Sequence, residues 1–142
     1  MKVKEVLRTG NVAWSPADQH PIYLAVGTAA QQLDATFSTS AAIELFQLTL
    51  SDTSLDMPCR ATLPSEHRFH KLVWGKHGRN GMGTVVAGGE QGAIYLYDPN
   101  ALLEGSGAAA VVAKCVKHTG QFAYISVPYV SRSLILRFNF IC

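Results

Sequence analysis

Short apolar segments separated by glycine, proline, serine and aspartate run along almost the whole of this 142-residue chain. Segments of this kind, rich in branched and aromatic side chains, are typical of β-strands. A long helix is not expected, because the best candidate, 102–112, is interrupted by Gly105 and Gly107. The sequence therefore predicts an all-β fold, with strands at 12–14, 22–27, 42–50, 59–63, 69–74, 84–87, 93–98 and 109–116.

The second group of four strands repeats the order of the first. Trp14 and Trp74 end the first strand of each group, and Gly27 and Gly88 lie at the end of the second. The later strands also correspond once a single insertion, 31–40, is allowed for. A four-stranded unit that recurs after several tens of residues is the plan of a β-propeller blade of the WD40 type. We expect the first blade at about 11–63 and the second at about 69–116.

The strand at 94–97 indicates how such blades are packed. Ile94, Tyr95, Leu96 and Tyr97 are all apolar or aromatic, although successive side chains of a strand point to opposite faces. A strand with one face in water would alternate with polar residues. Phe46, which corresponds to Tyr97 in the first unit, lies in a weaker version of the same pattern. Both faces therefore need cover, which a blade receives from its neighbours.

Two blades do not close a propeller, because closure takes roughly four to eight. His118, followed by Thr119 and Gly120, resembles the entry to a third blade, and a divergent apolar tail, 121–142, comes after it. We expect strands at 122–127 and 133–140 in this tail. The chain is predicted to be an incomplete propeller, either a fragment of a larger protein or a truncated product with an unrelated tail. Its open blade faces predict poor solubility alone.

The loop that carries Gly88, Gly89 and Gly92 has two interpretations. Glycine-rich loops can cradle a phosphate, but no lysine closes this one, and a dinucleotide fingerprint needs a helix after its third glycine. Gly92 instead precedes a strand of isoleucine, leucine and tyrosine. The favoured interpretation is a hairpin turn in which Gly92 takes a positive φ. The phosphate site is the alternative.

Residue spacing and charge give no support to catalysis or to a metal site. His67 and His70 lack a second pair that would complete a tetrahedral set of ligands. The sequence has no GxSxG elbow, and its three cysteines form no CxxC pair. A net charge of +2 is too small to favour nucleic acid. We expect no catalytic residue, metal or cofactor, in a cytoplasmic chain without a signal peptide or a transmembrane segment.

The insertion QQLDATFSTS, at 31–40, is the loop with the best prospect of a binding role. It is polar and rich in hydroxyl groups, and its candidate contact residues are Leu33, Asp34 and Phe37. One interpretation is a solvated hairpin loop that folds over its blade. The other is a loop that binds a partner or is phosphorylated, because loops on rigid scaffolds carry recognition.

Several stretches of the sequence together resemble one known family. They are AWSP at 13–16, HPIYLAVGTAAQQLDATFSTSAAIELFQL at 20–48, SLDM at 54–57, FHKLVWG at 69–75, AGGEQGAIYLYDP at 87–99 and KHTG at 117–120. The family is the large subunit of the COPII outer coat, and the resemblance is to its N-terminal WD40-type propeller. The resemblance covers 1–120, whereas 121–142 does not resemble the family's third blade.

This resemblance implies a non-catalytic scaffold that helps to form transport vesicles at the endoplasmic reticulum, for protein transport to the Golgi. It implies a peripheral location on the cytosolic face of endoplasmic reticulum exit sites and coated vesicles. The implied partners are other outer-coat subunits, which for the full-length family member include a smaller propeller subunit. A generic WD40 binding module, such as a ubiquitin-ligase substrate receptor, is the alternative.

The residues expected to matter are structural rather than catalytic. They form the signature of the two blades and of the junction with a third: Trp14, Gly27, Trp74, Gly88, Gly89, Gly92, Asp98 and His118. Asp98 closes its strand at the place where such repeats often carry Trp-Asp, and Tyr97 stands there for the tryptophan.

Overall fold

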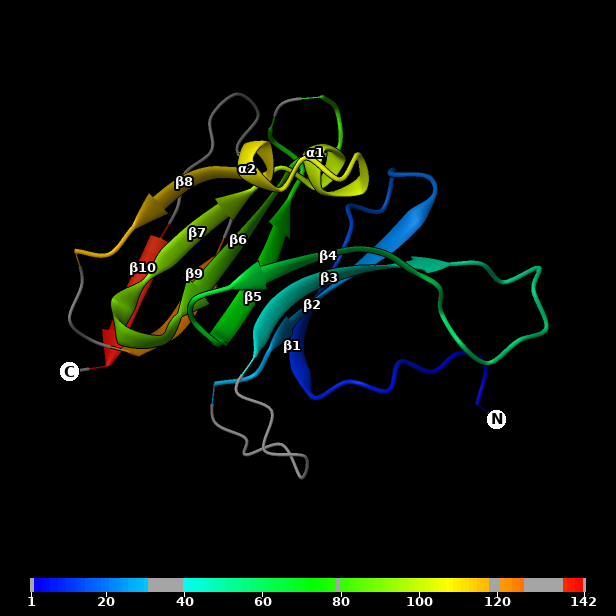
Figure 1. Cartoon of the computed structure of the whole chain (residues 1–142), viewed down its shortest axis with the longest axis horizontal. Coiled ribbons are helices and arrows are strands. Elements are labelled where there is room, and N and C mark those ends of the chain that lie inside the picture. The colour runs from blue at the N-terminus through cyan, green and yellow to red at the C-terminus, as the bar shows by residue number, and fades with distance from the viewer. Residues whose placement is uncertain (1, 31–39, 79, 118–120, 127–136, 142) are drawn as a thin grey trace.

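Two four-stranded antiparallel sheets dominate a computed structural model of the chain, which describes residues 2–30, 40–78, 80–117, 121–126 and 137–141 (Figure 1). The first sheet, blade one, has the order β1-β2-β3-β4, and the second, blade two, has the order β5-β6-β7-β8. A two-stranded antiparallel sheet, β9-β10, follows. The all-β prediction is thus confirmed for the described residues.

The strand bounds lie close to the predicted ones. In blade one the strands are β1 Gly10–Trp14, β2 Ile22–Thr28, β3 Ala41–Leu48 and β4 Cys59–Ser65. In blade two they are β5 Phe69–Gly75, β6 Thr84–Gly89, β7 Ile94–Tyr97 and β8 Val111–Cys115, and the last pair is β9 Gln121–Ser126 and β10 Arg137–Ile141. Each blade is a meander in which consecutive strands pair, so the turn-rich sequence leads directly to this topology.

The strand registers show that the two blades are repeats of one unit. In blade one, Trp14 pairs with Leu24, which pairs with Phe46. The same three-strand row in blade two runs from Trp74 through Val85 to Tyr97. The correspondence of Trp14 with Trp74 and of Phe46 with Tyr97, predicted from the sequence, is confirmed.

One hydrophobic core fills the space between the blades. Blade one contributes a face that includes Ala25, Ile43 and Leu45, and blade two contributes a face that includes Phe69 and Val85, all of them fully buried. The strand at 94–97 is covered on both faces, as its composition predicted, because Tyr95 and Tyr97 belong to this core and Ile94 is buried on the opposite face. Packing between the sheets is therefore what fixes their relative position.

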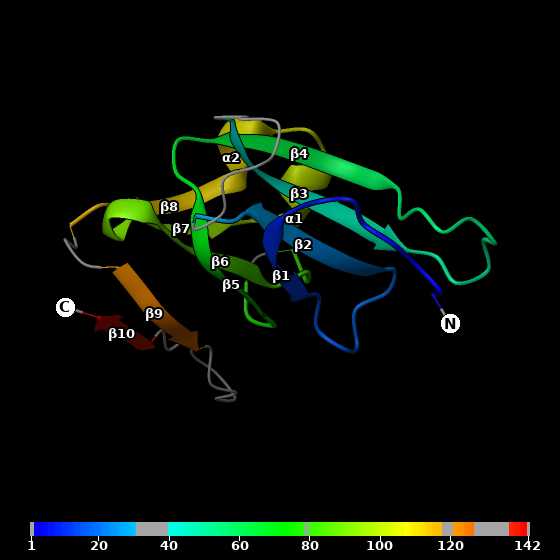
Figure 2. The ribbon, with the colours of Figure 1, turned by 90° about the horizontal axis from the view of Figure 1, so that it is seen from below.

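The pair β9-β10 lies beside blade two, where the next blade of a propeller would begin (Figure 2). The strand β9 contacts β5 and β6, and β1 contacts β5 in the same way, so the first strands of successive units are neighbours. Val86 is fully buried and Ile94 nearly so on the side of blade two that faces away from blade one. The predicted start of a third unit is therefore present as a hairpin-like pair of strands.

Three short helical segments were not predicted. A 3-10 turn, η1 Glu90–Gly92, joins β6 to β7, and two short helices, α1 Pro99–Leu103 and α2 Gly107–Ala110, lie in the connection from β7 to β8 (Figure 1). The strands predicted at 93–98 and 109–116 are correspondingly shorter. The cause is local: the Asp98 carboxylate accepts a hydrogen bond from the Asn100 N–H and Pro99 fits the first helical turn. Gly105, with φ of 76°, ends the helical path, as the sequence indicated.

Candidate functional site

The junction between the blades supports the base of the insertion loop. The backbone N–H of Ala30, just before the loop, donates to the carbonyl of Phe69 at 2.9 Å. The Asn11 side-chain amide donates to the same carbonyl at 2.8 Å. After the loop, the N–H of Ala42 donates to the Thr28 hydroxyl at 3.1 Å. Both ends of the insertion are thus attached to blade one, and its first end is also attached to blade two. Leu33, Asp34 and Phe37 themselves lie outside the described residues.

Gly27 is required at this junction because the other blade leaves no room for a side chain there. A Cβ atom on Gly27 would lie 2.6 Å from the Phe69 ring and 2.8 Å from a Leu72 methyl group. Both neighbours belong to β5 and are buried. The large ring on one blade therefore occupies the space that glycine leaves on the other.

The glycine loop between β6 and β7 is a hairpin turn, as favoured from the sequence. Gly92 has φ of 74°, and Gln91 also has a positive φ, of 57°. The Gly89 N–H donates to the Ala93 carbonyl, the Glu90 N–H to the Arg68 carbonyl, and the Ala93 N–H to the Glu90 carbonyl. A phosphate cradle needs free N–H groups that converge on one point. Those three N–H groups are used within the protein, so the phosphate interpretation does not fit the loop.

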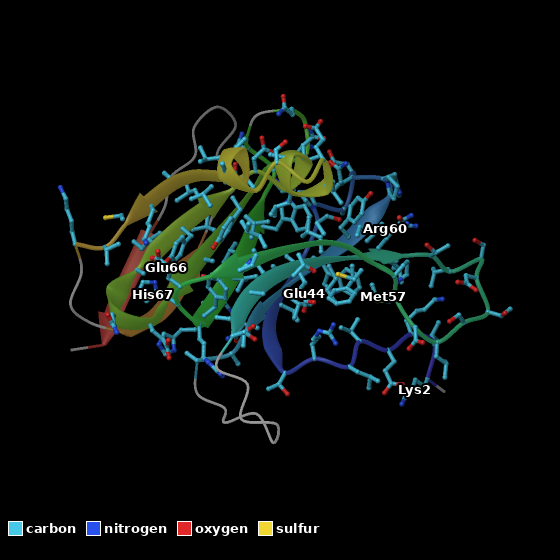
Figure 3. All side chains as sticks on the ribbon, viewed as in Figure 1. Lys2, Glu44, Met57, Arg60, Glu66 and His67 are labelled. Atoms are coloured by element: carbon cyan, nitrogen blue, oxygen red, sulfur yellow. The ribbon has the colours of Figure 1, made fainter. Side chains whose placement is uncertain are left out.

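Aromatic side chains line the face of blade two that packs on blade one. The rings of Tyr95 and Tyr97 are stacked with centroids 5.7 Å apart, and Phe69 meets both rings edge-on. The His67 Nδ1 atom lies 2.5 Å from the Tyr95 hydroxyl, and His67 follows Glu66 in the connection from β4 to β5 (Figure 3). Burial raises the pKa of Tyr97 well above its ordinary value, partly opposed by a hydrogen bond with Ser65. The rings of Phe69, Tyr95 and Tyr97 contribute packing to the core between the blades.

Ion pairs at the surface add a second kind of contact between the units. Lys76, in the β5–β6 connection, pairs with Asp18, in the β1–β2 connection. Lys114 of β8 pairs with Glu66, in the connection between the blades. The hydrogen bonds from these lysines lower the pKa values of the Asp18 and Glu66 carboxyl groups. All four side chains are at least one-third exposed, so each pair contributes little to stability.

Potential metal ligands are dispersed in the part of the chain that the structure describes. Within that part of the chain, no three histidine, cysteine or acidic side chains are grouped as metal ligands. Cys59 and Cys115 are present as free thiols. No helix in the described residues is long and apolar enough to cross a membrane. The described arrangement is two sheets packed on one core, with the connecting loops at its surface.

The predicted signature residues are not all alike in the structure. Trp74 is 8% exposed and its Nε1 donates to the Met82 carbonyl at 2.8 Å, whereas Trp14 is 52% exposed. Gly88 belongs to the β6–β7 ladder, where it pairs with Ile94. Asp98 is buried and caps α1 instead of ending a simple strand. His118 lies outside the described residues.

Sequence reasoning missed the residues that anchor the insertion. Phe69 accepts and Asn11 donates hydrogen bonds at its base, yet neither was among the residues expected to matter. An indirect signal existed for Phe69, because a bulky ring at the start of one repeat fits beside a glycine of the other repeat only if the two units pack together. Asn11 had no comparable signal, since polar residues near strand ends are common in any β-protein.

Comparison with known proteins gives strong and consistent matches. The chain is 52% identical over 139 residues to protein transport protein Sec31A of Mus musculus. The matched stretch covers 95% of this chain and 11% of that relative. The Danio rerio Sec31A is 48% identical over the same length, and Sec31 of Dictyostelium discoideum is 37% identical over 103 residues. This chain belongs to the Sec31 family. It spans about a tenth of the length of its Sec31 relatives. No family model matches it.

A solved structure supports the same assignment. A chain from "COPII on membranes, outer coat vertex" matches with a TM-score of 0.62 and 25% identity, over 83% of this chain and 28% of the other. The fold is therefore part of a WD40-type β-propeller of the kind found in that coat. Because the Sec31A match covers 95% of the chain, it also includes part of 121–142. That tail is not wholly foreign to Sec31, and how far it diverges stays a prediction.

Proposed function

We propose that this chain is a non-catalytic scaffold element of the COPII outer coat, acting in the formation of vesicles that carry protein from the endoplasmic reticulum to the Golgi. The observation that carries the proposal is the 52% identity to Sec31A across almost the whole chain, together with the structural match to an outer-coat vertex. Since the chain spans 11% of that relative, the proposed role is that of one part of the coat subunit.

The proposed mechanism is the presentation of loops by rigid blades. The strands before and after the insertion at 31–40 pair with one another, and the Ala30 N–H is hydrogen-bonded to the Phe69 carbonyl of the second blade. Such a base restricts the directions in which a loop can point, which lowers the entropic cost of binding. Leu33, Asp34 and Phe37 are proposed as the residues that contact neighbouring coat subunits.

The proposed location is the cytosolic face of endoplasmic reticulum exit sites and of COPII vesicles, reached through the coat. The partners are other outer-coat subunits, whereas contacts of the full-length relatives with the smaller propeller subunit are not transferred to this part. The proposal requires no metal, cofactor or nucleic acid. The generic WD40 receptor alternative has no feature of the described residues in its favour.

The test is recruitment of the chain to a reconstituted coat on liposomes. We expect the chain to sediment with liposomes that carry the complete coat and to stay in solution when the outer coat is omitted. Replacing Leu33 and Phe37 by serine should reduce the recovered fraction severalfold, because both apolar contacts are lost. Val112→Ser removes an exposed apolar side chain from β8, outside the insertion, and is the control, with recovery unchanged.

Two results would count against the proposal. Recovery that does not depend on the outer coat would indicate direct binding to lipid. Equal recovery of the Leu33/Phe37 variant and the parent chain would remove the loop from the mechanism and favour a generic binding module.

A further inference from the structure

The connection from β5 to β6 contains an asparagine followed by a glycine, Asn80 and Gly81, at an exposed turn. Both residues have a positive φ, 60° for Asn80 and 75° for Gly81. Glycine and asparagine are the residues that adopt this left-handed conformation at the lowest cost. The two residues therefore form the turn themselves, and the turn leaves Asn80 exposed.

This pair has a chemical property that the other asparagines of the chain do not share. The sequence has four asparagines, and Asn80 is the one that precedes a glycine, whereas Val12, Ala101 and Phe140 follow the others. An asparagine loses its side-chain amide when the backbone nitrogen of the next residue attacks the amide carbon, Cγ. A side chain on that next residue crowds the attacking nitrogen, and glycine has none.

The structure leaves room for this attack. Apart from its chain neighbours, no described heavy atom lies within 4 Å of the place that a Cβ atom on Gly81 would take. The Asn80 side-chain amide donates to the Asp98 carboxylate at 3.2 Å. Because this bond is at the long end of the usual range and Asn80 is exposed, the amide can exchange it for a bond to water.

The other asparagines lie in regular structure. Asn11 belongs to β1 and Asn139 to β10, and the Asn11 side-chain amide also donates to the Phe69 carbonyl at 2.8 Å. Asn100 belongs to α1, and its side-chain amide donates to the Glu104 carboxylate at 2.9 Å. Ring closure at these sites requires the backbone to leave its strand or helix, so their reaction should be slower.

We propose that Asn80 is a site of deamidation in the folded chain. The Gly81 nitrogen bonds to Asn80 Cγ and gives up its proton, and the side-chain nitrogen leaves as ammonia. Water then opens the cyclic succinimide at either of its two carbonyl groups, which yields aspartate or isoaspartate at this position. Water is the co-reactant, and the reaction needs neither an oxidant nor an enzyme. The proposal does not depend on the proposed coat function.

The product places a second carboxylate beside Asp98. Asp98 is 8% exposed, and its two carboxylate oxygens accept hydrogen bonds from the Asn100 N–H at 3.0 Å and from the Asn80 amide. Deamidation replaces the Asn80 donor with a negatively charged group that can only accept. Two carboxylates at contact distance repel each other. Since Asp98 caps α1 and α1 contacts β4, the repulsion weakens a contact between the two blades.

Peptide mapping by mass spectrometry of the full chain, aged at mildly alkaline pH, tests the site. We expect aspartate and isoaspartate to accumulate at Asn80 severalfold faster than at Asn11 or Asn100, with release of ammonia. Asn80→Gln keeps an amide at the turn but requires a larger ring, so the release of ammonia should fall severalfold. Asn100→Gln is the matched control and should leave the release unchanged. Circular dichroism verifies that each protein is folded while it ages.

A double-mutant comparison tests the consequence for stability. Asn80→Asp introduces the aspartate product directly and should lower the urea concentration at the midpoint of unfolding. Asp98→Asn removes the second charge and keeps a residue that caps helices well. In the Asp98→Asn background, Asn80→Asp should therefore lower the midpoint by much less than in the parent chain.

Three results would overturn these inferences. Equal rates at Asn80 and Asn11 in the parent chain would remove the deamidation site, and this comparison needs no variant to fold. Unchanged release of ammonia from folded Asn80→Gln would remove it as well. An equal effect of Asn80→Asp in both backgrounds would show that repulsion from Asp98 is not how the product acts.

Discussion

Gly27 sits where a single added carbon would meet a buried ring of the other blade. A β-branched side chain there would have to displace the Phe69 ring, which is fully buried and cannot rotate into open space. We expect Gly27→Val to lower the free energy of unfolding by about 1–3 kcal/mol, as overpacking of a core does. Urea unfolding measures the difference.

Gly107→Ala is the matched control for this prediction. Its Cβ would lie 3.0 Å from a terminal methyl group of Leu63, which can move, and Gly107 begins α2. We expect a change within about 0.5 kcal/mol. Similar losses at both glycines would show that the contact with Phe69 is not what requires Gly27.

Tyr97 makes stability depend on alkaline pH. Burial raises the pKa of its hydroxyl above the ordinary value of 10.0, so the folded state binds this proton more tightly than the unfolded state. The resulting stabilisation is complete below pH 10 and declines as pH rises above it, by up to about 1.4 kcal/mol per pH unit. In Tyr97→Phe, the part of the loss of stability at high pH that comes from this hydroxyl should vanish. Urea unfolding of both proteins at about pH 8 and about pH 11 tests it, and parallel declines would contradict the assignment.

At the scale of strands and blades, the two tryptophans provide an internal comparison. Trp74→Phe removes a hydrogen bond to the Met82 carbonyl and leaves space in the core, so we expect a loss of about 1–3 kcal/mol. Trp14→Phe is the same substitution at the equivalent position of blade one, on an exposed side chain. It should change stability by less than about 0.5 kcal/mol in dilute protein. Equal effects would mean that the two positions have the same environment in solution.

The same comparison shows what sequence patterns can and cannot predict. Strand positions and the matching of Trp14 with Trp74 follow from turn residues and apolar periodicity, which are local. The exposure of Trp14 does not, because it depends on whether a neighbouring sheet is present. The helix α1 was missed for a different reason: Asp98 and Pro99 end a strand and begin a helix with equal ease, and tertiary contacts of α1 with β4 accompany the helical choice. The residues at the base of the insertion, Phe69 and Asn11, could not be predicted, because local sequence patterns do not say which strands lie side by side.

At the scale of the whole molecule, the shared core couples the two blades. Ile43 and Leu45 of blade one and Phe69, Val85 and Tyr97 of blade two belong to one continuous cluster. Separating the blades would expose both halves of this cluster to water, at a cost proportional to the apolar area exposed. Neither sheet has an alternative partner for that face within the described residues. The blades are therefore expected to be stable together and not apart.

We therefore expect the two blades to unfold in one cooperative transition. In a Trp14→Phe background, Trp74 fluorescence reports on the interface and far-ultraviolet circular dichroism reports on both sheets, and the two urea transitions should coincide. Ile43→Val, a change in blade one alone, should shift both signals together by about 0.5–1.5 kcal/mol, because Ile43 is fully buried in the shared core. If Ile43→Val instead moved the circular dichroism signal and left the Trp74 transition in place, blade two would be folding independently. The core that joins the blades would then contribute to their orientation but not to their stability.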